Sequence, residues 1–75
     1  MSRDPVTERN AEMSLRHVAA SSKMFEAAMS QLDARMLIGD EKLIEQQRQA
    51  CVAAFEAVVD AKIIAFKALK LLQED

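Results

Sequence analysis

The 75-residue chain contains no Trp or Tyr and only one Gly, one Pro and one Cys. Sheet folds need turn residues about every 8–12 positions, so the shortage of Gly and Pro argues against an all-β or α/β fold. The single cysteine, Cys51, cannot form an internal disulfide. A chain this short buries only roughly 60% of its unfolded surface, which excludes a large enzyme core. The sequence therefore predicts a small all-α domain built from Ala, Leu, Ile, Val and Met.

An excess of charge of one sign is also absent. Ten basic and twelve acidic side chains give a net charge of −2, which does not attract nucleic acid or an anionic membrane. The most apolar stretch, residues 61–72, contains three lysines and falls short of the ~18 uninterrupted apolar residues of a membrane span. The first twenty residues lack the apolar region of a secretory signal. We expect a cytoplasmic protein with no membrane and no nucleic-acid partner.

Helix-end signals divide the chain once. Asp4-Pro5 is typical of a helix start, because proline at the first helical position loses no hydrogen bond. Gly39, the only glycine, is typical of a residue just past a helix end, and Asp40 can cap the next helix. The signals predict an antiparallel helical hairpin in one domain (1–75), with a helix over 5–37, a turn at 38–40 and a helix over 41–73. The weak helix formers at 21–22 leave open a bend or a short separate N-terminal helix.

Apolar residues recur in steps of three and four along each predicted helix, which places them on one stripe. Two such stripes joined by a short turn predict a seam between antiparallel helices. If the chain reverses at Gly39, residues whose numbers add up to about eighty lie opposite each other, so that Phe25 faces Phe55. The predicted intramolecular seam contains Leu15, Val18, Phe25, Met29, Leu32, Cys51, Val58 and Leu69.

Further apolar residues lie off this seam. The second helix carries Val52, Val59, Ile63 and Phe66 roughly 90° around from the first stripe. The first helix carries Met13, Ala20, Met24, Ala27 and Ala34 away from its seam. Two antiparallel helices cannot bury all of these side chains, and a contiguous apolar surface on a small chain is typical of a protein interface. The alternative is an N-terminal segment that folds back over one stripe.

No group of residues indicates catalysis, a cofactor or a metal. The one imidazole, His17, and the one thiol, Cys51, are about twelve residues apart along the predicted hairpin, or ~18 Å. The seam contains no carboxylate, and Glu12 and His17 do not have the Glu-x-x-His spacing of helical metal sites. One glycine cannot form a phosphate-binding loop. The sequence predicts a protein that is not an enzyme and uses no cofactor or metal.

Two groups of basic residues invite other interpretations. Arg9, Arg16 and Lys23 form a short basic line, but glutamates lie among them and no aromatic residue could stack on a base. Lysines beside Ile63 and Phe66 resemble a basic amphipathic helix of the kind that binds membranes or calmodulin. Protein contact explains them more simply, because lysine stems can frame an apolar patch.

The polar and apolar residues over 22–70 follow a recognisable order. The segments that show it are 25–29 (FEAAM), 31–32 (QL), 36–40 (MLIGD), 45–50 (EQQRQA) and 55–64 (FEAVVDAKII). This arrangement resembles the small helical-hairpin co-chaperone subunits of bacterial type III secretion needle proteins.

The resemblance implies a non-enzymatic co-chaperone. In such systems the hairpin pairs with a tetratricopeptide-like chaperone, and the pair holds the needle subunit monomeric in the cytoplasm before export. Carried over to this chain, the contact with the chaperone consists of Val52, Phe55, Val59, Ile63 and Phe66.

Two other functions fit the same pattern. One is a homodimeric four-helix bundle, such as a phage or plasmid regulator that binds and inhibits another protein, in which the second stripe packs against its copy. The other is the needle subunit itself, which is disfavoured because the Pro-containing turn of that family is missing here.

Overall fold

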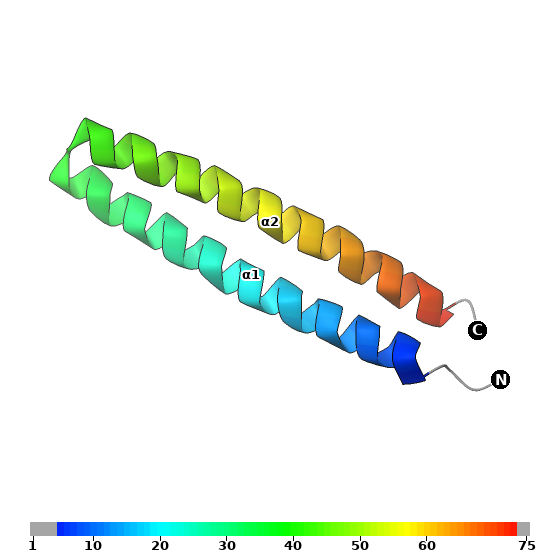
Figure 1. Ribbon diagram of the computed structural model, residues 1–75. Coiled ribbons are helices and arrows are strands. Elements are labelled where there is room, and N and C mark those ends of the chain that lie inside the picture. The colour runs from blue at the N-terminus through cyan, green and yellow to red at the C-terminus, as the bar shows by residue number, and fades with distance from the viewer. Residues whose placement is uncertain (1–4, 74–75) are drawn as a thin grey trace.

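Two antiparallel helices form the structure, a computed structural model that describes residues 5–73 (Figure 1). Helix α1 spans Pro5–Ile38 and helix α2 spans Glu41–Gln73. The all-α hairpin is therefore confirmed, and each helix end lies within one residue of the predicted position. Residues 1–4 and 74–75 lie outside the described part, and with them the expected N-cap, Asp4.

Helix α1 is continuous from its first turn to the hairpin turn. It runs through Ser21 and Ser22 without a break, and Ser21 is buried against α2. Within residues 5–73 there is thus neither a separate N-terminal helix nor a segment folded back over the hairpin. The alternative, in which such a segment covers one apolar stripe, is therefore not found in this part of the chain.

The turn uses the two residues that the sequence indicated. Gly39 has φ of 84°, a left-handed conformation that glycine adopts without steric cost, and its N–H donates to the Arg35 carbonyl at 3.0 Å. Asp40 Oδ1 accepts hydrogen bonds from the backbone N–H of Lys42 at 3.0 Å and of Leu43 at 3.3 Å. Gly39 therefore ends α1 and Asp40 caps α2, as predicted.

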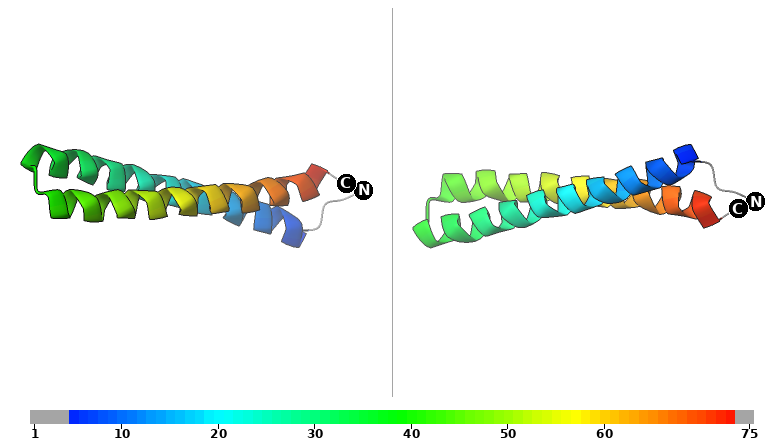
Figure 2. Two further views of the ribbon diagram at one scale, coloured as in Figure 1. Left: turned by 90° about the horizontal axis from the view of Figure 1, so that it is seen from above. Right: turned by 90° about the horizontal axis from the view of Figure 1, so that it is seen from below.

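The hairpin is a narrow rod, 59 × 13 × 13 Å, in which the helices cross over each other along their length (Figure 2). Its radius of gyration is 17.1 Å, whereas a compact domain of this length has about 11 Å. Its accessible surface is 5912 Å², against about 4,600 Å² for a compact monomer of this mass. The rod thus exposes much more surface than a globular chain of its size.

The contact between the helices follows two rows of residues with heptad spacing. The first row is Ala11, Val18, Phe25 and Leu32 on α1 with Ile44, Cys51, Val58, Ala65 and Leu72 on α2. The second row is Thr7, Ser14, Ser21, Ala28 and Arg35 on α1 with Gln47, Ala54, Ala61 and Ala68 on α2. All of these residues are buried or half-buried. Most second-row residues are small, which allows the helices to approach closely.

Five of the predicted seam residues, Val18, Phe25, Leu32, Cys51 and Val58, lie in the first row, and the other three lie beside the second row. Leu15, Met29 and Leu69 were expected in the seam, but the structure leaves 47%, 45% and 38% of their surfaces exposed. Each follows a second-row residue by one position, so it lies on the flank of the contact. The physical reason is size: small side chains occupy the line of closest approach, and the larger neighbours are displaced to the side.

One buried polar side chain links the two helices. Gln47 is buried, and its Nε2 donates to the Ala28 carbonyl of α1 at 3.0 Å. A buried amide is stable only where its hydrogen bonds are satisfied, so this bond favours one rotation and one register of α2 against α1. It helps to determine which side of α2 remains exposed.

Candidate interaction surface

The five residues singled out on the second helix lie on an exposed side of α2. We call them the α2 surface: Val52, Phe55, Val59, Ile63 and Phe66, with 55%, 53%, 38%, 48% and 63% of their surfaces exposed. Three of them follow the first-row residues Cys51, Val58 and Ala65 by one position. One residue turns an α-helix by about 100°, so these three side chains point well away from the contact with α1.

The C-terminal half of the α2 surface is hollowed. A shallow groove of about 440 Å³ is lined by Val59, Lys62, Ile63, Phe66, Lys67 and Lys70. The ammonium nitrogen of Lys70 lies 6.0 Å from the centre of the Phe66 ring, at the outer limit of a cation–π contact. The groove therefore has an apolar floor and a basic border.

Phe55 belongs to both the hairpin contact and the α2 surface. Its ring centre lies 5.6 Å from that of Phe25, with the ring planes inclined by 56°, a geometry that aromatic pairs favour. Phe25 is half-buried, whereas more than half of Phe55 is exposed. The aromatic pair predicted from the register is thus present, at the edge of the contact.

The structure extends the apolar area beyond the predicted residues. Leu15 and Met29 on α1 follow the second row by one position, as Phe55 and Leu69 do on α2. The two helices of an antiparallel pair are related by a local two-fold axis, so equivalent positions lie on the same side of the hairpin. A flank of exposed large side chains therefore spans both helices beside the α2 surface. Hydrophobicity alone does not distinguish a flank from a contact, so the sequence pattern predicts Leu15, Met29 and Leu69 in the seam.

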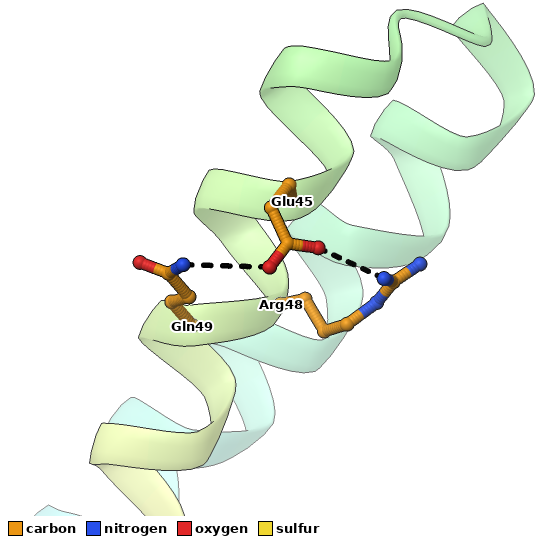
Figure 3. A network of polar contacts seen from close by, with 3 residues as sticks. All are labelled: Glu45, Arg48 and Gln49. Carbon is orange, nitrogen blue, oxygen red and sulfur yellow. Dashed lines mark hydrogen bonds and ion pairs between the residues drawn. The ribbon is translucent and has the colours of Figure 1, made fainter.

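The charged groups at the start of α2 contrast with those at its end. Near the turn, Glu45 accepts from Arg48 Nη1 at 2.9 Å and from Gln49 Nε2 at 3.4 Å (Figure 3). Towards the C-terminus, none of the ion pairs within residues 5–73 involves Lys62, Lys67 or Lys70. These three lysines are exposed, and their charges are not neutralised by a carboxylate of the described chain.

The remaining candidates for chemistry are not brought together. Cys51 is buried in the first row, and His17 is exposed on α1. Arg16, in the middle of the basic line, forms an ion pair with Glu12 at 3.0 Å. Among residues 5–73, no three His, Cys, Asp or Glu side chains cluster in a way that could hold a metal ion. In the same part of the chain, neither helix is apolar enough over a sufficient length to cross a membrane.

A second hollow of about 370 Å³ lies between the helices and is lined by Met24, Ala27, Ala28, Gln31, Gln47, Ala50 and Ala54. Its lining combines alanines with the amide side chains of Gln31 and Gln47. No carboxylate, imidazole or thiol is among these residues, so the hollow offers no acid, base or nucleophile.

In comparisons with known proteins, no family model matches the chain, and neither a curated protein nor a solved structure is significantly similar to it. The exposed apolar surface and the sequence pattern over 22–70 are therefore the grounds for a functional proposal.

Proposed function

We propose that this chain is a non-enzymatic protein-binding module that acts as a co-chaperone. In this proposal the α2 surface binds a tetratricopeptide-like chaperone, and the pair holds a type III secretion needle subunit in the cytoplasm before export. The observation that carries the proposal is the exposure of five large apolar side chains on one side of α2, whose other side already packs against α1. The secretion context comes from the sequence resemblance over 22–70.

The energetics favour covering this surface. Burying a fully exposed Val, Ile or Phe side chain contributes about 1.5–3 kcal/mol, so completing the burial of these half-exposed side chains contributes on the order of 1 kcal/mol each. A narrow hairpin of this length has a small core and gains stability when a partner covers its apolar side. The rod shape also presents the residues in a line, which suits a concave partner such as a stack of helical repeats.

Co-expression with a tetratricopeptide-like chaperone encoded in the same genome tests this function. Size-exclusion chromatography with light scattering measures whether a stable complex forms. We expect the wild-type chain to form the complex and Phe66→Asp or Ile63→Asp to abolish it, while circular dichroism shows that helicity is retained. Met13→Asp is the matched control, because Met13 is exposed to a similar extent but lies on α1. A complex that survives both α2 substitutions contradicts the proposed contact.

A homodimeric regulator of the phage or plasmid type is the second candidate. The observation that favours it is the flank with Leu15, Met29 and Leu69, which spans both helices and matches the broad face that a second hairpin covers in a four-helix bundle. In that case Leu15→Asp dissociates a dimer of the purified chain. If the co-chaperone function holds, the same substitution leaves the mass of the isolated chain unchanged.

A further inference from the structure

We propose that the groove at the C-terminal half of α2 binds an acidic amphipathic helix: a partner segment with a row of apolar side chains bordered by carboxylates. This inference rests on the proposed function and specifies the chemistry of the partner. Its basis is the combination of a straight apolar floor with three lysines along its border that form no ion pair with another residue of 5–73.

The floor of the groove fits a helix in shape. Val59, Ile63 and Phe66 are spaced i, i+4 and i+7, so their side chains form a row nearly parallel to the axis of α2. The lining extends from Val59 to Lys70, which is about 16 Å at 1.5 Å per residue. A straight apolar row of this length can pack against another helix of roughly three turns, because the side chains of one helix fit between those of the other.

The lysines at the border of the groove favour a partner helix that carries negative charge. From Ala61 to Gln73 the chain contains three lysines and no carboxylate, although the whole chain has a net charge of −2. None of the three lysines forms an ion pair with another described residue. Carboxylates of a partner would meet these ammonium groups at the rim of an apolar contact, where charge determines orientation and the choice of partner.

The same charges disfavour other occupants. A symmetric dimer centred on the groove would bring Lys62, Lys67 and Lys70 of one copy against the same residues of the other, and like charges repel. The net charge of −2 weakens attraction to an anionic membrane, whose charge extends far beyond the groove, whereas a short acidic helix meets mainly the three lysines. An amphipathic helix with carboxylates beside its apolar row can contact the apolar floor and pair with the lysines at the border.

Two synthetic peptides of about 18 residues, or five helical turns, test the inference. Both have the same row of Leu and Ile, bordered by Glu in one peptide and by Lys in the other. Fluorescence anisotropy of the labelled peptides measures binding to the full-length chain. We expect the Glu peptide to bind at least about tenfold more tightly than the Lys peptide at low salt, and this difference to shrink at about 0.5 M salt.

Charge reversal supplies the control. In the triple variant Lys62→Glu, Lys67→Glu and Lys70→Glu, the preference should reverse in favour of the Lys peptide. The variant Arg9→Glu, Lys23→Glu and Lys42→Glu changes the net charge equally but leaves the groove intact, and it should keep the preference for the Glu peptide.

The inference would be overturned if the wild-type chain bound both peptides equally or bound neither. It would also be overturned if the Arg9→Glu, Lys23→Glu and Lys42→Glu variant reversed the preference, or if the wild-type chain bound anionic lipid vesicles more tightly than the Glu peptide. Self-association that the groove variant abolishes would identify a second copy as the occupant and would also overturn it. Failure here is distinguishable from failure of the proposed function. Ile63→Asp can still abolish the complex with the chaperone when the lysines have no influence on peptide choice.

Discussion

Phe25 of α1 and Phe55 of α2 pack with their ring centres 5.6 Å apart, yet 53% of the Phe55 surface remains exposed. One side of the Phe55 ring therefore stabilises the hairpin, and the other side is available to a partner. Phe66, eleven residues further along α2, has no such contact with α1 in the described chain: its ring lies near Lys70 of its own helix. Phe55 thus contributes to both stability and the exposed surface, whereas Phe66 contributes to the surface alone.

Phe55→Ala should lower the free energy of unfolding by about 1–2 kcal/mol, less than the 3–5 kcal/mol of a fully buried phenylalanine, because half of the ring is already in water. Phe66→Ala should change it by less than about 0.5 kcal/mol, as exposed substitutions do. Urea denaturation followed by circular dichroism measures both. Equal losses for the two variants would mean that the contact between Phe55 and Phe25 adds no stability.

Ala61 tests the small-residue contact. It is 1% exposed and lies in the second row, where the helices approach closely. Ala61→Leu should destabilise the hairpin by about 1–3 kcal/mol, since a larger side chain forces the helices apart. Ala53→Leu, at an exposed position of the same helix, should have an effect within about 0.5 kcal/mol. Thermal unfolding of the two variants gives the comparison, and a neutral Ala61→Leu would show that the second row has room for a larger side chain.

The hydrogen bond from Gln47 to the Ala28 carbonyl can be tested through the pH dependence of stability in a variant. Gln47→Glu places a carboxylate, which cannot donate, against that carbonyl. Burial raises the pKa of the introduced carboxyl above its unfolded value of about 4.3. The protonated form can donate, so the variant should be closest to wild-type stability at about pH 4 and should lose stability relative to wild type as the pH rises towards 7.

Gln47→Ala is the control for this titration, because it has no ionisable group. It should lose about 1–2 kcal/mol at both pH values through the missing hydrogen bond. Denaturation curves of wild type and both variants at the two pH values measure these changes in the free energy of unfolding. A pH-independent loss in Gln47→Glu would show that position 47 is open to water.

The turn residues should each have a measurable cost. Gly39→Ala should destabilise the hairpin by about 1 kcal/mol through the left-handed backbone alone, since no heavy atom lies within 4 Å of the added Cβ. Gly39→Asn should cost less, because asparagine tolerates this conformation. Asp40→Ala should cost about 0.5–2 kcal/mol by removing the cap, and Asp40→Asn should restore most of it. Equal stability of Gly39→Ala and wild type would contradict a positive φ at residue 39.

Most of the fold could be read from the sequence because its end signals are local. Gly39 and Asp40 act within one turn of the backbone, and the apolar first-row residues such as Val18, Cys51 and Val58 stand out by hydrophobicity. The second row could not be found in this way, because Ser14, Ala54 and similar residues add little to an apolar stripe. Their signal is different: small, uncharged side chains every seven residues, with larger apolar neighbours one position later.

The candidate surface could be predicted because the chain has more apolar side chains than two helices can bury, and not because it carries a motif. Val59, Ile63 and Phe66 could be assigned to a second stripe because two helices cannot bury every apolar side chain. The sequence could not show that Leu15, Met29 and Leu69 extend the apolar area across both helices, because this depends on the rotation of each helix about its axis. That rotation is set by close packing of small residues and by the Gln47 hydrogen bond.

The proposed function requires that a different protein, and not a second copy of the chain, covers the α2 surface. Sedimentation of the purified chain over a wide range of concentration distinguishes the two, with interference optics because the chain has no Trp or Tyr. We expect a mass of 8.4 kDa, or weak self-association that rises with concentration by mass action. A dimer that persists on dilution and that Phe66→Asp converts to monomer would refute the proposed function, because the surface would then be covered by a second copy of the chain.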